Sequence, residues 1–195
     1  NGDLKQVNGI IYRNQDEIIH TEKRRRIRKV DEIPWPAWDL VPVENYLEKM
    51  LSHGPGRGRT IPILASRGCP YDCAFCSNKA MYTRAWIPRS VTDVVEEIKY
   101  YIKKYNIQCV EFYDLTTIVK KSWIIDFCNQ LIDQNVKIAW QLPGGTRTEA
   151  IDEEVIVLTK KAGCTYLGFA PESGSEEVLI KIRKQVNLKR MLWLL

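Results

Sequence analysis

Apolar and polar residues alternate in two different rhythms from Ile61 onward. Short apolar runs, which are typical of buried strands, are separated by longer segments in which apolar residues recur every three or four positions, as on one face of a helix. The apolar runs are IPILAS (61–66), CVEFYD (109–114), KIAWQL (137–142) and TYLGFA (165–170). This regular alternation predicts strands and helices in turn, which indicates an α/β fold with a parallel sheet and right-handed crossovers.

The helices between these runs carry boundary signals. Ser90, with Asp93 three residues later, is a variant capping box, and Gly163 is a typical residue after a last helical turn. The predicted apolar faces are Val91, Val94, Val95, Ile98 and Ile102 in the first helix, Trp123, Phe127 and Leu131 in the second, and Val155, Leu158 and Ala162 in the third. A fourth helix is predicted over 175–183, so we expect four βα units.

Four segments with candidate chemistry follow the four predicted strands. They are the cysteine-rich segment 66–78, DLTT (114–117), PGGTR (143–147) and PESGS (171–175). Because the carboxyl ends of parallel strands lie at one edge of a sheet, we expect all four segments on the same rim. That rim is where α/β proteins place their working residues.

The first 60 residues follow a different pattern. Segment 7–20 has two β-rich runs around a turn, which predicts a hairpin. The proline-rich stretch DEIPWPAWDLVP (31–42) excludes a helix or a central strand, because prolines lack amide donors. HGPGRGRT (53–60) is predicted to be a flexible surface loop, since it lacks the Gly-Lys-Ser/Thr of a phosphate-binding loop. We therefore divide the chain into a hairpin and Pro-rich linker, 1–60, and a core domain, 61–195.

Composition and charge narrow the functional classes. The chain is 45% hydrophobic and 27% charged, as in ordinary soluble globular proteins, and no apolar stretch is long enough to span a membrane. Much of the net charge of +5 comes from EKRRRIRK (22–29). A solvated linker face is the simpler interpretation, and a patch for nucleic acid or anionic lipid is the alternative. The cysteine usage does not resemble a secreted disulfide framework and favours a reducing cytoplasm.

Three cysteines lie within eight residues of the segment SRGCPYDCAFCSN (66–78): Cys69, Cys73 and Cys76. Clustered thiolates suit zinc or an iron–sulfur centre, but a structural zinc site needs four ligands. The chain has only two histidines, His20 and His53, and both precede the strand and helix alternation. A three-cysteine cluster with one open iron position is therefore favoured over zinc or inert thiols.

The remaining cysteines are predicted to be structural. Cys109 and Cys164 stand near the beginnings of predicted strands, on the rim opposite the cysteine-rich segment, and Cys128 stands in the middle of a helix. Each is expected to be a small buried hydrophobic residue, which argues against a closed four-cysteine site.

CPYDCAFC (69–76) resembles the Cys-x3-Cys-x2-Cys signature of the radical S-adenosylmethionine (SAM) superfamily, including the aromatic residue Phe75 before the last cysteine. The signature also follows the first strand of a βα series, as it does in that superfamily. The resemblance implies that Cys69, Cys73 and Cys76 hold a [4Fe–4S] cluster, and that SAM binds the fourth iron through its amino and carboxylate groups. It also implies a partial (β/α) TIM-type barrel, here truncated after about four βα units.

The rim segments extend this resemblance. PESGS looks like the Glu-Ser-Gly-Ser segment of the branch that includes tRNA methylthiotransferases and cobalamin-dependent enzymes. The likeness implies that Glu172 and Ser173 lie near the ribose or methionine moiety of SAM, although Glu172 could instead cap the helix that begins near Ser175. EFYDLTT (111–117) occupies the place where the family receives the SAM amino group, but the usual paired acids are reduced to Asp114.

Two further side chains have competing interpretations. Phe75 would stack on the adenine of SAM if the methionine end chelates the cluster, or else it fills the core beneath the loop. Arg147 would bind the SAM carboxylate, or else it forms an ion pair with Glu149.

The leading segment resembles the join between an N-terminal cobalamin-binding domain and a radical SAM barrel, as in relatives of anaerobic magnesium-protoporphyrin ester cyclase. This implies a cobalamin domain before residue 1, with Trp35 and Trp38 packing the linker against the barrel. The hypothesis is a radical SAM enzyme that forms a 5′-deoxyadenosyl radical and is reduced by flavodoxin or ferredoxin, with cobalamin as a further cofactor. The alternatives are a tRNA-modifying enzyme resembling methylthiotransferases and a non-catalytic iron–sulfur or zinc module. The sequence does not predict the substrate.

Overall fold

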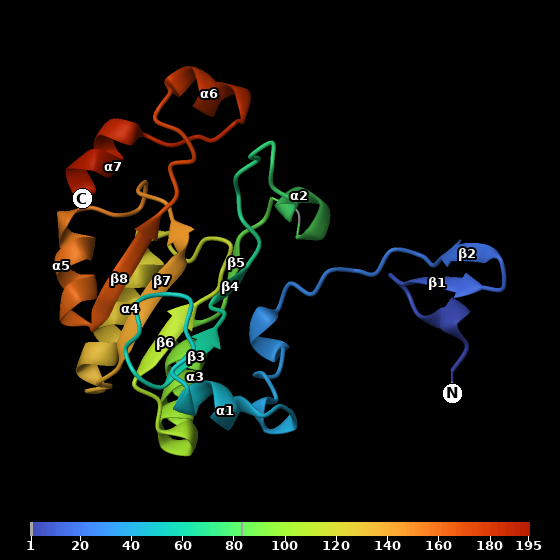
Figure 1. Cartoon of the computed structure of the whole chain (residues 1–195), viewed down its shortest axis with the longest axis horizontal. Coiled ribbons are helices and arrows are strands. Elements are labelled where there is room, and N and C mark those ends of the chain that lie inside the picture. Colours follow the sequence, from blue (N-terminus) through green and yellow to red (C-terminus); the bar gives the residue numbers. More distant parts are fainter. Residues whose placement is uncertain (1, 83) are drawn as a thin grey trace.

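The computed structural model describes residues 2–82 and 84–195 of the chain, and a four-stranded parallel sheet forms its centre (Figure 1). The strands are β3 (Thr60–Ile63), β6 (Cys109–Phe112), β7 (Ala139–Thr146) and β8 (Cys164–Phe169). They lie in the order β3-β6-β7-β8, which is also their order along the chain. The predicted α/β fold with consecutive βα units is confirmed.

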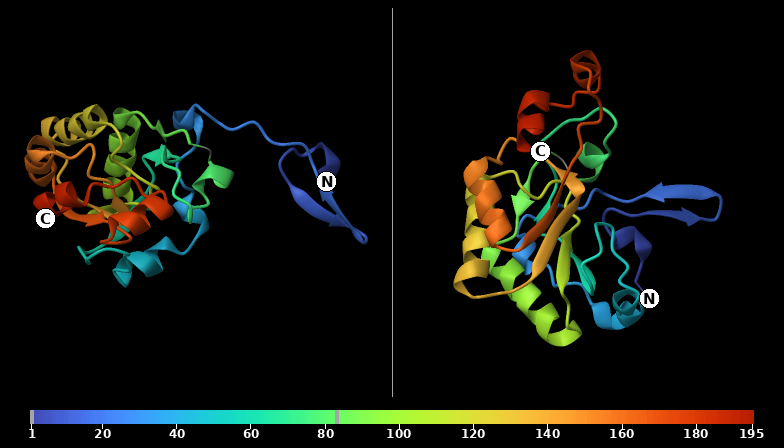
Figure 2. Two further views of the ribbon diagram at one scale, coloured as in Figure 1. Left: turned by 90° about the horizontal axis from the view of Figure 1, so that it is seen from above. Right: turned by 60° about the vertical axis from the view of Figure 1, so that its left-hand side comes forward.

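Three amphipathic helices form one layer against the sheet, as the view from above in Figure 2 shows. They are α3 (Val91–Tyr105), α4 (Lys121–Asp133) and α5 (Glu153–Lys161). The ring of Phe112 is 5.5 Å from that of Phe127 and 5.9 Å from that of Trp140, and all three rings are almost fully buried. Burial of this apolar surface stabilises the layer by about 25 cal/mol per Å² removed from water.

The segment HGPGRGRT (53–60), predicted to be a flexible loop, is instead anchored on the sheet. The carboxylate of Glu111 accepts hydrogen bonds from the backbone N–H groups of His53 and Gly54 at 3.0 and 2.7 Å, and Gln141 donates to the carbonyl of Pro55 at 2.8 Å. A Cβ atom at Gly54 would lie 2.2 Å from the side-chain oxygen of Gln141, so any other residue here would have to displace that side chain. Two polar side chains of the strands therefore hold the loop in place.

The N-terminal hairpin is confirmed as β1 (Ile11–Asn14) and β2 (Glu17–His20), and Figure 1 shows it standing away from the sheet. The linker behind it packs on α3, as predicted. The indole N–H of Trp35 donates to Asp93 at 3.1 Å, and its ring lies 5.6 Å from that of Tyr100. The short helix α1 (Val43–Glu48) begins directly after the last proline of the linker.

The capping box predicted at Ser90 is only half formed. Its hydroxyl accepts the N–H of Asp93 at 3.3 Å, but the N–H of Ser90 donates to Asp31 of the linker at 2.9 Å. The carboxylate of Asp93 is engaged instead by Arg89 and Trp35. A long-range contact thus replaces the local one.

Strand β7 is longer than the sequence indicated. It was expected to end at Leu142, but it continues to Thr146, and its register with β8 shifts between these two residues. An irregularity of this kind accommodates proline and glycine within a strand. Most of the segment PGGTR (143–147) therefore belongs to the strand and is not a separate loop.

Several short elements around the rim were not anticipated. Strands β4 (Ser66–Arg67) and β5 (Ile87–Pro88) form an antiparallel pair, and the chain between them contains the three clustered cysteines and α2 (Asn78–Met81). The predicted fourth helix is α6 (Glu176–Lys181), and α7 (Leu188–Leu194) follows it. Among the described residues, none of the helices has the length and apolar character needed to cross a bilayer.

Candidate cluster and cofactor site

The three clustered cysteines lie on one loop beyond the carboxyl end of β3, between β4 and α2. Two side attachments hold this loop. The amide of Asn78 donates to the carbonyl of Cys69 at 2.8 Å, and the N–H of Ala74 donates to the carbonyl of Ile182, just after α6, at 2.8 Å. The loop is therefore fixed to its own helix and to the segment that follows the fourth strand.

The thiols of this loop are free, with Cys69 and Cys73 partly buried and Cys76 exposed. Burial raises the pKa of the Cys69 thiol. Within residues 2–82 and 84–195, no three Cys, His, Asp or Glu side chains converge as metal ligands. The donor set nevertheless fits an iron–sulfur cluster in its chemistry, because three thiols on one anchored loop leave one iron position without a cysteine. Ligation by these residues stays a prediction.

Arg147 lies beside the cysteine loop and is 7% exposed. Its guanidinium carbon is 3.5 Å from the centre of the Tyr71 ring, and its Nη2 is 3.5 Å from the sulfur of Cys73. Its Nη1 donates to the carbonyl of Gln185 and lies 3.6 Å from the carboxylate of Glu149. The predicted ion pair with Glu149 is therefore present, while a contact with the SAM carboxylate stays a prediction.

Glu172 follows β8 in a left-handed conformation, with φ of +68°. Its carboxylate pairs with Lys184 at 2.8 Å, and the Lys184 ammonium lies 5.9 Å from the centre of the Phe75 ring. The segments after the first and fourth strands thus meet at Lys184. Sequence reasoning missed Lys184, because a lysine beyond a helix end carries no distinctive local signal.

Two of the competing interpretations are wrong. Ser175 caps α6, since its side chain accepts the N–H of Val178 at 3.4 Å, so Glu172 is not the cap. Phe75 is 58% exposed and does not fill the core beneath the loop. The hydroxyl of Ser173 accepts the N–H of Ser175 at 3.1 Å, which fixes the turn before the helix. Roles for these side chains in SAM binding stay predictions.

Asp114 is buried at the end of β6. Its carboxylate accepts hydrogen bonds from the N–H of Ala65 at 3.0 Å and from the hydroxyl of Ser66. Desolvation raises the pKa of Asp114 to about 6, against the opposing effect of the Ser66 hydrogen bond. In this arrangement Asp114 joins the ends of two neighbouring strands at the base of the cysteine loop, and a contact with SAM stays a prediction.

We expect Asp114→Asn to flatten the pH dependence of stability between about pH 4 and 6. The pKa of Asp114 is higher in the folded state than in the unfolded state, so its stabilising contribution is complete below about pH 4. As the pH rises through about 6 that contribution is lost, and the free energy of unfolding decreases by roughly 3 kcal/mol in total. Urea unfolding at several pH values measures the slope. An unchanged slope in the variant would show that other groups cause the pH dependence.

The three other cysteines are placed as predicted. Cys109 begins β6 and Cys128 lies within α4, both fully buried, and Cys164 begins β8 and is partly buried. Burial raises the pKa of each thiol to about 12. All three are therefore held as neutral, structural thiols.

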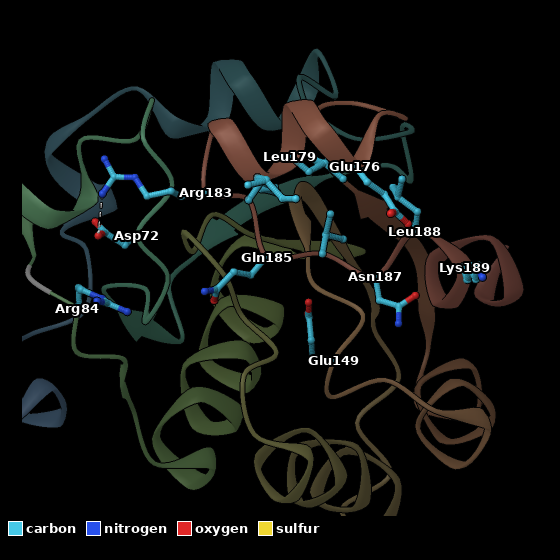
Figure 3. Close-up of a pocket in the computed structure, with 13 residues that line it drawn as sticks. Asp72, Arg84, Glu149, Glu176, Leu179, Arg183, Gln185, Asn187, Leu188 and Lys189 are labelled. Carbon is cyan, nitrogen blue, oxygen red and sulfur yellow. Dashed lines mark hydrogen bonds and ion pairs between the residues drawn. The ribbon is translucent and has the colours of Figure 1, made fainter.

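A cavity of about 890 Å³ adjoins the site (Figure 3). Asp72 of the cysteine loop and Arg84, which follows α2, form one side. The segment 183–189 forms another, with Arg183 paired to Asp72 at 3.4 Å. Glu149, the partner of Arg147, lies at its wall. Its volume is in the range of small-molecule sites. The cysteine loop, Arg147 and this cavity are therefore contiguous.

Residues 63–195 match the sequence profile of the radical SAM superfamily. The chain is 30% identical over 185 residues to an uncharacterised methyltransferase of Pyrococcus horikoshii, covering 95% of this chain and 38% of that protein. It is 29% identical to the anaerobic magnesium-protoporphyrin IX monomethyl ester cyclase of Synechocystis, covering 93% of this chain and 35% of that protein. The chain thus spans little more than a third of the length of these relatives.

A solved structure has the same fold. The cobalamin-dependent SAM radical enzyme OxsB, determined with aqua-cobalamin and SAM bound, superposes with a TM-score of 0.76 at 23% identity, covering 96% of this chain and 27% of that one. This likeness concerns the fold and confirms the predicted barrel type. Because the family profile matches residues 63–195, which include the cysteine loop and strands β6, β7 and β8, the chain belongs to the radical SAM superfamily.

Proposed function

We propose that the protein containing this chain is a radical SAM enzyme in which Cys69, Cys73 and Cys76 hold a [4Fe–4S] cluster. The observation that carries the proposal is the Cys-x3-Cys-x2-Cys loop beyond the first strand of a βα series in a chain of this superfamily. When bound, the cluster and SAM supply one-electron cleavage of the sulfonium carbon–sulfur bond and a 5′-deoxyadenosyl radical that abstracts hydrogen from a substrate. The residues of this chain bind and orient these groups.

Five side chains are proposed to hold SAM. Arg147 provides a buried positive charge beside Cys73, suited to the SAM carboxylate. Glu172 provides acceptors for the ribose hydroxyls, shared with Lys184, and the exposed ring of Phe75 provides a face for the adenine. The other two are Ser173, in the turn before α6, and Asp114, at the end of β6.

We expect Phe75→Ala and Glu172→Gln each to weaken SAM binding while iron and sulfide content stays unchanged. Loss of stacking on a base costs about 1–3 kcal/mol, and Phe75→Tyr should retain most of the affinity because it keeps a ring. The measurement is SAM affinity of the folded, cluster-replete variants by equilibrium binding.

Two matched controls accompany this experiment. Tyr46 on α1 is 56% exposed, so Tyr46→Ala removes an exposed ring elsewhere. Glu177 pairs with Lys181 at 2.7 Å in α6, so Glu177→Gln makes the same substitution in a solvent-exposed ion pair. Neither control should change SAM affinity. Unchanged affinity in both test variants would show that SAM is placed wrongly.

We also propose that a cobalamin-binding domain precedes residue 1 in the longer protein, in a reducing cytoplasm. The support is the linker resemblance and the fold likeness to OxsB, which was solved with cobalamin. The full-length protein should take up a corrinoid, whereas residues 1–195 alone should not. A full-length sequence without an upstream α/β domain would contradict this.

A further inference from the structure

The proposed function assigns no role to the basic run of the linker. Five of the six residues 23–28 are basic: Lys23, Arg24, Arg25, Arg26 and Arg28. All five are exposed, and none of the ion pairs within the described residues involves Lys23, Arg24, Arg25 or Arg28. We call these five residues the basic strip. Its charge is therefore available to a partner.

The strip is attached beside the cysteine loop. The guanidinium of Arg26 donates to the carbonyl of Ala80 at 3.1 Å, and Ala80 lies in α2. Figure 1 shows the linker passing beside α2 on its way from the hairpin to the sheet. Ala80 stands four residues after Cys76 in the chain, so the attachment point of the strip follows closely on the last cysteine of the loop.

The edge of the loop that faces α2 is open and positively charged. Cys76 is exposed, and the N–H of Asn78 lies 3.5 Å from its sulfur. Lys79 lies 3.7 Å from the carboxylate of Asp72 and has a side chain that is 66% exposed, and Arg84 is also exposed. Asp72 is the only acidic residue between 66 and 84. The strip therefore continues a basic surface around the cysteine that is most accessible to solvent.

We propose that the basic strip is the docking surface for an acidic one-electron carrier protein, such as a flavodoxin, that reduces the cluster. This inference rests on the proposed function. Electron transfer through protein becomes steeply slower with distance, so a carrier must dock near an exposed edge of the cluster loop. In each encounter the carrier loses one electron and the cluster gains it, with no transfer of atoms. Complementary charge accelerates such encounters.

A nucleic acid is the less favoured partner for this surface. Segment 23–28 has no aromatic side chain on which a base could stack, and its only apolar residue is Ile27. Its attachment at α2 also places the strip near the loop that is proposed to hold the cluster. A protein that reduces the cluster must dock near this loop, whereas binding of a nucleic acid does not require that position.

The test variant is Arg24→Gln/Arg25→Gln/Arg28→Gln in the full-length protein, with Arg26 retained as the attachment. The matched control is Lys103→Gln/Lys137→Gln/Lys161→Gln, which removes the same charge from exposed positions near the amino ends of the strands. Stopped-flow absorbance measures cluster reduction by flavodoxin hydroquinone and by dithionite, and a separate binding assay measures the affinity of oxidised flavodoxin.

We expect the test variant to be reduced by flavodoxin about tenfold more slowly at low salt, with a weaker salt dependence and a lower flavodoxin affinity. Dithionite reduction should be unchanged in both variants, and the control should match the wild type with flavodoxin. Equal flavodoxin rates in test and control variants overturn the proposal. A wild-type protein that takes up no cluster overturns the proposed function first, and this inference with it.

Discussion

Replacement of Cys69, Cys73 or Cys76 by Ala is expected to abolish the iron–sulfur cluster. Each thiolate would hold a different iron of a [4Fe–4S] cluster, and the other three cysteines are placed too far along the fold to substitute, at strand beginnings and within α4. Anaerobic reconstitution should therefore give the wild type a broad visible absorption that each single variant lacks. Iron and sulfide analysis gives the same comparison in numbers.

The control for this experiment is Cys164→Ala, which removes a partly buried thiol at the start of β8. It should retain the full cluster content of the wild type, because Cys164 lies at the opposite end of the strand from the rim. Full cluster content in all three loop variants would contradict the assignment of the ligands.

Arg89→Met is expected to destabilise the fold by about 3–5 kcal/mol, because it leaves a buried charge without its partner. Arg89 pairs with Glu97, which is 1% exposed, and with Asp93, and it donates to the carbonyl of Leu64 at 2.8 Å. These contacts join the end of β3 to α3 directly behind β5. Urea denaturation followed by circular dichroism measures the change in unfolding free energy.

The double variant Arg89→Met/Glu97→Gln separates the lost pair from lost packing. Tyr101 donates to Glu97 at 2.7 Å and can donate equally to glutamine, so removing both charges should restore at least about 1 kcal/mol. A double variant as unstable as the single one would refute the electrostatic explanation. Because Arg89 stands next to the strand that closes the cysteine loop, cluster uptake should fall together with stability.

The sheet and its helices could be predicted from the sequence because their signals are local. Val94, Val95 and Ile98 mark one helical face through spacing alone, and all three are fully buried. The spacing of Cys69, Cys73 and Cys76 likewise needs no knowledge of the fold to be recognised.

The parts that the sequence did not predict depend on distant partners. Glu111 holds Gly54 across 57 residues, which turned an expected flexible segment into an anchored loop. Arg147 meets Cys73 across 74 residues, and Asp31 completes the cap at Ser90 across 59. A polar side chain does not indicate its partner through its own neighbours in sequence, so these contacts required the structure.

The most direct test of the central claim is formation of 5′-deoxyadenosine by the full-length protein after anaerobic reconstitution, reduction and addition of SAM. The account predicts that the nucleoside forms with the wild-type protein and is absent with Cys69→Ala, Cys73→Ala and Cys76→Ala. A wild-type protein that holds the reduced cluster and binds SAM but releases no 5′-deoxyadenosine would contradict it, and would favour a non-catalytic iron–sulfur module.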